Sequence, residues 1–317
     1  MAHRVLVVRF GSLGDVVLTA PVVRLIRERY PEAEVTYVTK ARWAPIVERM
    51  SGVNRTAALM TGESVASLAK RVGGDFDYRV DLHASLRSRL LRWRVPGPWR
   101  VVRGQRLQRR WRAWRHRALP AMPHMVECYL RALREAGLDV VADGQPGRIV
   151  ATGEDRAQAA HVVEGDYTVI CPGAAHANKR WPVAHWQALI QELGGTVVAT
   201  GTGAERGLLP TGALDAFGLP LGPTAALLAG ARCVIANDSG LMHLAGAVGT
   251  PVVALFGPTS PTLGYAPHGG RHQILERDLP CRPCSTHGGP HCPLRTHACL
   301  RGLLPQSVVQ AARSLVA

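Results

Sequence analysis

The sequence predicts an α/β protein of two domains, each built on a parallel sheet covered by helices. Short apolar runs typical of buried strands alternate with helical patterns in both halves of the chain. A stretch rich in Pro and Gly, Asp139–Arg148, separates the halves and is the expected linker. The length of 317 residues leaves room for a core in each half. We therefore expect domains over residues 1–145 and 146–317.

The first half is expected to hold three strands and two long helices. The strands are predicted over Val5–Phe10, Glu34–Thr39 and Tyr78–Leu82, and the helices over Asp15–Tyr30 and Met122–Ala136. Strands alternating with helices imply parallel pairing. Ligands of such sheets bind at the carboxyl ends of the strands.

The second half repeats this alternation. Strands are predicted over Thr168–Cys171, Thr196–Thr200, Cys233–Ala236 and Val252–Phe256, and helices over Val183–Leu193 and Thr224–Ala229. A C-terminal helix over residues 303–317 is expected to pack back on the N-terminal domain.

Composition narrows the class of protein. The apolar content of 47% is normal for a globular chain. The apolar run near the N-terminus is too short for a signal sequence, and prolines and glycines break the charge-free stretch 240–270 into a helix, a strand and a loop. Seven cysteines without a signal sequence favour reduced thiols. We expect a cytoplasmic protein.

The first motif, Phe10-Gly11-Ser12-Leu13-Gly14-Asp15, follows a strand and opens a helix. Gly11 and Gly14 allow a tight turn and the close approach of a ligand. Asp15 falls in the first helical turn, where the helix dipole favours a carboxylate. Two interpretations stay open, a functional carboxylate and a residue that only caps the helix.

The second motif runs from Cys171-Pro172-Gly173 to Asn178-Lys179-Arg180, again between a strand and a helix. A glycine turn at Gly173 with Lys179 and Arg180 at a helix entrance suits a diphosphate, because backbone N–H groups and cations converge there. A plain basic loop is the alternative.

The third motif is Asn237-Asp238-Ser239-Gly240-Leu241-Met242-His243, after the strand Cys233–Ala236. Asp238 and Ser239 can cap the following helix, and Gly240 permits close approach of a ligand. His243 lies one turn further along the helix, where a satisfied core histidine is the usual interpretation.

Together these motifs resemble a known family. The segments FGSLGDVVLTAPVVRLIRERYP, CPGAAHANKRWP and NDSGLMHLAGAVGTPVVALFGPTSP resemble the signature segments of the lipopolysaccharide heptosyltransferases of glycosyltransferase family 9. The segments VDLHASLRSRLL and HMVECYLRALREAGL resemble its intervening parts, so the likeness spans nearly the whole chain.

The resemblance implies a GT-B fold, with two Rossmann-like domains facing across a cleft. It implies an acceptor on the N-terminal domain, a nucleotide sugar on the C-terminal domain, and transfer of heptose from ADP-heptose to the lipopolysaccharide core, with inversion and without a metal or other cofactor. Asp15 is the implied catalytic base. The implied donor-binding residues are Lys179, Arg180, Glu205, Asp238, Ser239, Gly240 and His243.

One departure from the family pattern concerns the donor. Some members carry two threonines ahead of the phosphate-binding lysine, where this chain has Ala174 and Ala175. Another nucleotide sugar therefore stays open as the donor, and a non-catalytic binder of anionic polymers is the second alternative.

Arginine is concentrated in one part of the chain. The chain carries a net charge of +15. Twelve arginines and no acidic residue lie between Asp81 and Glu127, so the excess of positive charge is confined to this part of the chain. Within it, Gln105–Leu119 predicts an amphipathic helix suited to an anionic membrane surface or to acceptor phosphates. A solvated basic face is the alternative, and nucleic acid is the rival partner that we do not expect. The apolar face comprises Leu107, Trp111, Trp114 and Ala118. The predicted acceptor or membrane surface comprises Arg87, Arg106, Arg109, Arg110, Trp111, Arg112, Trp114 and Arg115.

The C-terminal region holds the pattern Cys281-x2-Cys284-x7-Cys292-x6-Cys299. Four thiols that begin with C-x-x-C fit a structural zinc ion. The second pair has the wrong spacing for that site, so buried or free thiols are the favoured interpretation.

Overall fold

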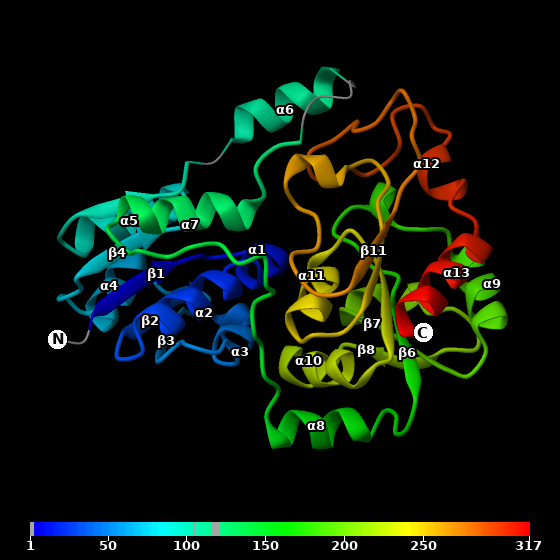
Figure 1. The fold of residues 1–317 in the computed structure, drawn as a ribbon, viewed down its shortest axis with the longest axis horizontal. Coiled ribbons are helices and arrows are strands. Elements are labelled where there is room, and N and C mark those ends of the chain that lie inside the picture. Colours follow the sequence, from blue (N-terminus) through cyan, green and yellow to red (C-terminus); the bar gives the residue numbers. More distant parts are fainter. Residues whose placement is uncertain (1–2, 104, 116–120) are drawn as a thin grey trace. The chain divides into compact units, whose positions relative to one another are not determined.

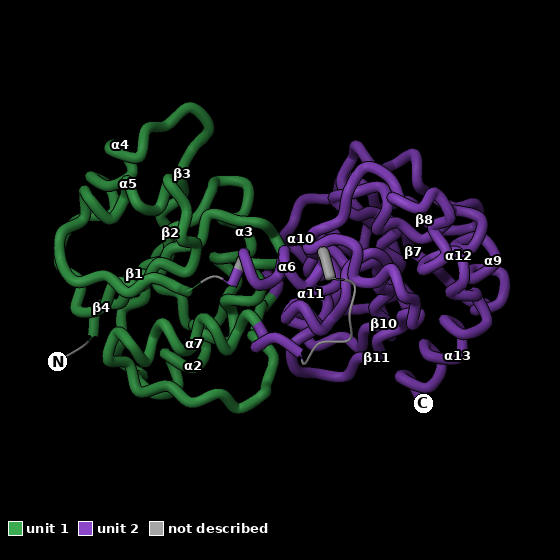
Figure 2. The backbone as a smooth tube through the Cα atoms, turned by 90° about the horizontal axis from the view of Figure 1, so that it is seen from above, with its two compact units in different colours: residues 1–104, 125–150 green, residues 105–124, 151–317 purple. Residues whose placement is uncertain are grey.

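The protein, described here by a computed structural model, divides into two compact units (Figure 2). Unit 1 comprises residues 1–104 and 125–150, and unit 2 comprises residues 105–124 and 151–317. The structure describes residues 3–103, 105–115 and 121–317, and of residues 106, 114 and 115 it describes the backbone alone. The assignment of acceptor and donor roles to the two parts of the chain stays a prediction.

Unit 1 is built on a five-stranded sheet in the order β3-β2-β1-β4-β5, with every neighbouring pair parallel (Figure 1). The strands are β1 (Arg4–Val8), β2 (Glu34–Lys40), β3 (Arg55–Leu59), β4 (Tyr78–Asp81) and β5 (Trp99–Val101). The helices are α1 (Leu13–Val17), α2 (Ala20–Arg29), α3 (Ala44–Val47), α4 (Val65–Val72), α5 (Leu86–Arg94) and α7 (Met125–Glu135). The order reverses between β1 and β4, which makes their carboxyl ends the switch point of this sheet.

Unit 2 is built on a six-stranded parallel sheet in the order β11-β10-β9-β6-β7-β8. The strands are β6 (Tyr167–Cys171), β7 (Thr196–Gly201), β8 (Leu214–Phe217), β9 (Cys233–Asn237), β10 (Val252–Leu255) and β11 (His272–Leu275). The α-helices are α6 (Arg106–Arg115), α8 (Gly153–Ala160), α9 (Val183–Leu193), α10 (Leu221–Gly230), α11 (Gly240–Ala247), α12 (Ala298–Arg301) and α13 (Pro305–Val316). Here the order reverses between β6 and β9, the second switch point.

The predicted fold class is confirmed, since both sheets are parallel and are joined through helices. The strands β3, β5, β8 and β11 were not predicted, and the single helix predicted over Asp15–Tyr30 is wrong. It is two helices, because Pro21 lacks an N–H and its ring excludes the carbonyl of Val17 from a continuous helix. Thr19 is the N-cap of the second helix, and its hydroxyl donates to Val16 O at 2.6 Å.

The stretch 240–270 forms a helix, a strand and a loop, as predicted. These are α11, β10 and a loop that contains the short 3-10 turn Pro261–Leu263. Among the described residues, no helix has both the length and the apolar character needed to span a bilayer.

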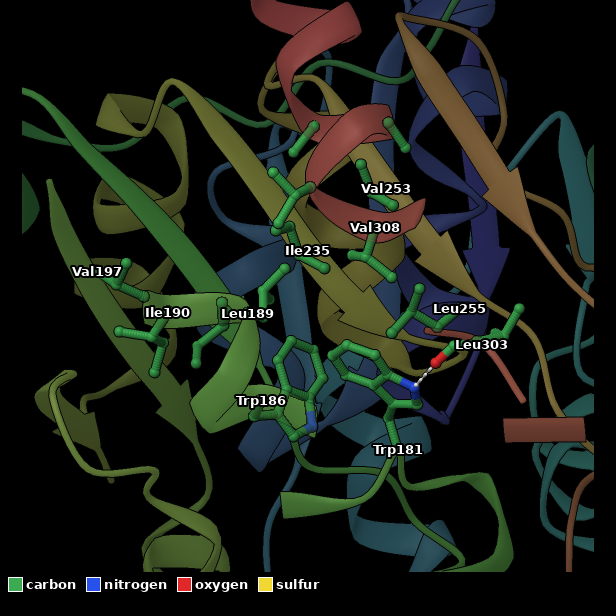
Figure 3. Packing of buried hydrophobic residues seen from close by; sticks show 14 of the residues in the cluster. Trp181, Trp186, Leu189, Ile190, Val197, Ile235, Val253, Leu255, Leu303 and Val308 are labelled. Carbon is green, nitrogen blue, oxygen red and sulfur yellow. Dashed lines mark hydrogen bonds between the residues drawn. The ribbon is translucent and has the colours of Figure 1, made fainter. Parts of the chain in front are cut away.

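The core of unit 2 is centred on two tryptophans (Figure 3). The rings of Trp181 and Trp186 meet edge to face with centroids 4.9 Å apart, and both residues are at most 1% exposed. Trp181 Nε1 donates to Leu303 O at 2.9 Å, which ties the start of α9 to the approach of α13. Val308 of α13 joins the same cluster, so the C-terminal helix packs on the sheet of its own unit. Its predicted packing on the N-terminal domain stays a prediction.

Replacing Leu189, which is fully buried in this cluster, tests how tightly the core is packed. We expect Leu189→Ala to lower the free energy of unfolding by about 2–5 kcal/mol, because the removed methyl groups leave a cavity. The matched control is Leu304→Ala in the same unit, a side chain of the same type that is 55% exposed. Equal midpoints of urea unfolding for the two variants would contradict this packing.

Candidate functional site

The first motif lies at the switch point of unit 1. Asp15 is the third residue of α1, and Ser12 is its N-cap. Asp15 Oδ2 accepts hydrogen bonds from Ser12 N at 3.1 Å and from Ser12 Oγ at 2.9 Å. One oxygen of the carboxylate therefore makes the contacts of a capping residue, while the other oxygen faces a different partner, and both interpretations of Asp15 stay open.

That partner is Arg9, a residue the sequence analysis did not single out. Arg9 Nη2 lies 2.7 Å from Asp15 Oδ1, and the Arg9 side chain is 9% exposed. The guanidinium also donates to Leu82 O after β4 and lies over the ring of Tyr129, 5.7 Å from its centroid. An arginine that ends a buried strand just before a glycine turn was the available signal.

This environment keeps Asp15 ionised. Burial disfavours the charged carboxylate, but the positive charge of Arg9 and the hydrogen bonds from Ser12 outweigh burial and lower the pKa of Asp15. The pKa of Arg9 is raised: burial opposes its charge, while Tyr129 and Asp15 favour it. The result is a pair that is charged at neutral pH at the end of β1.

Gly11 is required by its surroundings. Its φ of +142° is outside the range that other residues adopt readily, and a Cβ here would lie 2.7 Å from Trp43 Nε1. Gly14 is buried within α1. The two glycines thus serve the turn that carries Asp15.

Basic side chains lie at the same edge of unit 1. Arg87 lies over the ring of Phe10, 5.9 Å from its centroid, and Arg42 lies over the ring of Trp43 at 4.5 Å. Burial, the largest cause, and the charges of Arg42 and Arg87 together lower the pKa of Lys40 at the end of β2. The predicted residue Arg87 therefore belongs to a cationic group beside the Asp15 loop.

The second and third motifs meet at the switch point of unit 2. Lys179 Nζ lies 2.6 Å from Asp238 Oδ2, and these side chains are only 12% and 10% exposed. Thr259 Oγ1 donates to the same carboxylate oxygen at 2.6 Å. The structure therefore brings together the predicted residues Lys179 and Asp238.

Asn237, which the sequence analysis did not assign, joins these two loops. This fully buried residue accepts from Trp181 N at 3.1 Å and donates to Pro172 O at 2.8 Å. It connects the end of β9 to the start of the second motif and to the residue that follows the motif. A buried amide at the end of an apolar strand was the signal for it.

Arg180, Glu205 and Gly173 form a second group. Arg180 donates to Ala174 O at 3.0 and 3.1 Å, and its Nη2 lies 3.8 Å from Glu205 Oε1. Glu205 Oε2 accepts from Thr202 N and Oγ1 at 3.0 and 2.8 Å. A Cβ on Gly173 would lie 2.4 Å from Glu205 Oε1, so the glycine admits this carboxylate.

The helix α11 begins beside Asp238. Ser239 is its N-cap, but the predicted capping bond is not made, and Ser239 Oγ has no hydrogen bond to any residue that the structure describes. Gly240 is the first residue of the helix, and His243 is 8% exposed. Ser239, Gly240 and His243 therefore lie at the start and in the first turn of the helix that follows Asp238 in the chain.

Helix α6 carries the predicted basic surface. Leu107 and Trp111 are 80% and 47% exposed, and Arg110 is exposed. The prediction that Arg109 lies on the surface is wrong, because this residue is only 3% exposed. Its Nε donates to Leu263 O at 2.9 Å, and its guanidinium lies 4.8 Å from the ring centroid of Tyr265. A carbonyl and an aromatic face replace water around this cation. Arg112 is half-buried.

Parts of the predicted surface lie outside the described residues. These are the side chains of Arg106, Trp114 and Arg115, and residue Ala118 with its neighbours over 116–120.

The cysteine-rich segment contains free thiols at Cys281, Cys284, Cys292 and Cys299. In the described part of the chain, no three His, Cys, Asp or Glu side chains converge as metal ligands. The preference for free thiols over a zinc ion stays a prediction. Burial and the neighbouring thiols raise the pKa of Cys284 to about 11. A cavity of about 500 Å³ lies against this segment. It is lined by Ala177, Asn178, Pro290, His291, Cys292, Arg295 and His297.

The family model of glycosyltransferase family 9 (heptosyltransferase) matches residues 65–204 and 218–291. The chain belongs to glycosyltransferase family 9. A relative, lipopolysaccharide heptosyltransferase 1 of Pseudomonas aeruginosa, is 34% identical over 313 residues, which cover 89% of this chain and 86% of the relative. The chain is therefore an enzyme that transfers a glycosyl group.

Solved structures show the same fold. A family 9 glycosyltransferase from Veillonella parvula has a TM-score of 0.80 at 23% identity, covering 99% of this chain and 97% of that chain. The ADP-heptose LPS heptosyltransferase II of E. coli has a TM-score of 0.76 at 24% identity, covering 99% and 98%. Two parallel sheets in the GT-B class are thus shared with family 9 enzymes.

Acid titration tests the Arg9–Asp15 pair. A carboxyl whose pKa lies below its ordinary value of 3.8 in the folded chain stabilises the fold above that value, and this stabilisation is lost as the pH falls through the folded pKa. We expect the free energy of unfolding of the unmodified enzyme to fall more steeply below about pH 5 than that of Asp15→Asn. Urea unfolding between about pH 6 and pH 2 measures both slopes, and parallel curves over that range would contradict the pairing.

Proposed function

We propose that this family 9 glycosyltransferase moves heptose from ADP-heptose to a lipopolysaccharide-core-like acceptor, with Asp15 as the general base. The observation that carries the proposal is the carboxylate of Asp15, kept ionised by Arg9 and Ser12 at the switch point of unit 1. The activities of similar enzymes, lipopolysaccharide heptosyltransferase 1 of Pseudomonas aeruginosa and the ADP-heptose LPS heptosyltransferase II of E. coli, suggest the donor and the acceptor class.

The proposed reaction inverts the anomeric centre and uses no metal. Asp15 accepts the proton of the acceptor hydroxyl as that oxygen attacks the anomeric carbon. Its low pKa makes it a weak base, which is sufficient if the diphosphate departs ahead of the attack. Lys179 and the amino end of α11 at Ser239 stabilise the negative charge of the departing diphosphate.

The donor pocket of the proposal lies at the switch point of unit 2. Lys179 meets the phosphates, and its neighbours Asp238, Ser239, Gly240 and His243 line the pocket. Glu205 and Arg180 lie at the adjoining strand end, where the nucleoside is expected. Another nucleotide sugar is the alternative donor, because alanines replace the threonines that some members carry at Ala174 and Ala175.

The acceptor is proposed to be a lipid-linked, anionic glycan. The cations Lys40, Arg42 and Arg87 beside the Asp15 loop support an acceptor with phosphate or carboxylate groups. A non-catalytic binder of anionic polymers would need these cations but not Asp15.

Replacing Asp15 distinguishes a glycosyltransferase that uses this base from a non-catalytic binder of anionic polymers. We expect Asp15→Ala to lower the transfer rate by at least about 100-fold, as loss of a general base does, and to leave ADP-heptose binding unchanged. The measurements are transfer assays and calorimetry against ADP-, UDP- and GDP-sugars. Transfer at the parental rate would exclude Asp15 as the base, and preference for UDP- or GDP-sugars would exclude ADP-heptose as the donor.

The enzyme is further proposed to work on the inner face of the cytoplasmic membrane as a peripheral protein. Exposed Leu107 and Trp111 on α6, next to Arg110, give an apolar strip flanked by positive charge. Such a helix binds anionic lipid through burial of its apolar side chains and through attraction between its positive charges and the lipid head groups. Nucleic acid is not expected to bind, since the apolar strip has no role on a phosphate backbone.

Liposome binding tests the strip. We expect the double variant Leu107→Ser, Trp111→Ser to bind liposomes containing phosphatidylglycerol about tenfold more weakly than the unmodified enzyme, because apolar area is removed from the lipid contact. The control is Leu294→Ser, which removes a side chain 60% exposed on the same unit. Equal lipid binding by all three proteins, or tighter binding to duplex DNA than to liposomes, would contradict the proposal.

A further inference from the structure

The cysteine-rich segment is bound to the loop that carries Lys179. Asn178, the residue before Lys179, is 5% exposed, and all of its polar groups form hydrogen bonds with the cysteine-rich segment. Its Oδ1 accepts from Gly289 N at 2.8 Å, and its Nδ2 donates to His291 O at 3.2 Å. Its backbone N donates to Gly289 O at 3.3 Å, and its carbonyl pairs with His297 Nε2 at 2.6 Å.

Gly288 lies directly against the Lys179 side chain. A Cβ built on Gly288 would lie 2.8 Å from Lys179 Cδ, 2.9 Å from Lys179 Cγ and 2.8 Å from His176 Cβ. The missing side chain therefore provides the space through which the lysine stem runs. Hydrogen bonds with Ser285 hold Gly288 in place, at 2.8 Å through its N–H and 3.0 Å through its carbonyl.

The segment is also fixed to the other side of the ion pair. Cys284 N and Ser285 N donate to Pro258 O at 2.9 and 3.2 Å. Pro258 precedes Thr259, whose hydroxyl donates to Asp238. The contacts form a closed ring that runs from Asp238 through residues 258–259 and 284–288 to Lys179 and back to Asp238.

We propose that Gly288 and Asn178 are positioning residues that hold the Lys179 ammonium where the diphosphate of the donor binds. The inference rests on the proposed role of Lys179 in donor binding. The segment acts by its shape and hydrogen bonds: the gap at Gly288 directs the lysine stem, and Asn178 fixes the loop from which that stem leaves.

The test is calorimetric titration with ADP. We expect Gly288→Ala to weaken ADP binding about tenfold, the size of one charge-assisted contact, because the new methyl group displaces Lys179. The control is Gly249→Ala in the same unit. Gly249 has φ +93°, close to the +95° of Gly288, but a Cβ there meets nothing within 4 Å. The control therefore carries the backbone strain without the contact.

A double-variant cycle shows whether Gly288 acts through Lys179. We expect Lys179→Ala alone to weaken ADP binding, and Gly288→Ala to have no further effect in the Lys179→Ala background. If Lys179→Ala leaves ADP binding unchanged, the proposed role of Lys179 is wrong. If Lys179→Ala weakens binding but Gly288→Ala does not, or if the two effects add in full, the positioning inference is overturned.

Asn178→Ala provides an independent variant should Gly288→Ala fail to fold. It removes the bonds to Gly289 N and His291 O without introducing a clash. We expect the same pattern, weaker ADP binding that disappears in the Lys179→Ala background. Additive effects would again overturn the inference, and thermal unfolding of each variant confirms that folded protein is compared.

Discussion

The reversal of strand order inside each parallel sheet is the constraint on which both candidate sites depend. Where two neighbouring strands send their connections to opposite faces, the loops after them separate and leave their backbone groups and first helical turns accessible. In unit 1 this place lies after β1 and β4, and in unit 2 after β6 and β9. The catalytic candidate Asp15 and the pair Lys179–Asp238 occupy these two places.

Both places keep charged groups in largely buried surroundings, which is unfavourable unless each charge has a partner. Arg9 and Ser12 satisfy Asp15, while Thr259 and Lys179 satisfy Asp238. Each set joins the end of one strand to a neighbouring loop. The same contacts that stabilise the charges therefore also fix the positions of the loops.

The glycine loops and the charges next to them were predictable because strand, turn and helix follow one another within a few residues. The burial of Arg9 and Asn237 was not predicted because it depends on contacts with Leu82 and Pro172, which lie 73 and 65 positions away in the chain. The burial of Arg109 depends on a carbonyl 154 positions away. The four missed strands are the outermost strands of the two sheets and are only partly buried, so a continuous apolar run is not needed there.

The anchoring of Arg109 fixes the rotation of α6 about its own axis. Successive residues of a helix are about 100° apart, so Leu107 and Trp111, two positions either side of the anchor, are directed to nearly the opposite side. Because the acceptor of the anchor is a backbone carbonyl, sequence change at residue 263 leaves it in place. Insertion or deletion of one residue between the anchor and Trp111 would instead turn the indole by about 100°. Substitution at residue 263 is therefore tolerated more easily than a change in the number of residues between Arg109 and Trp111.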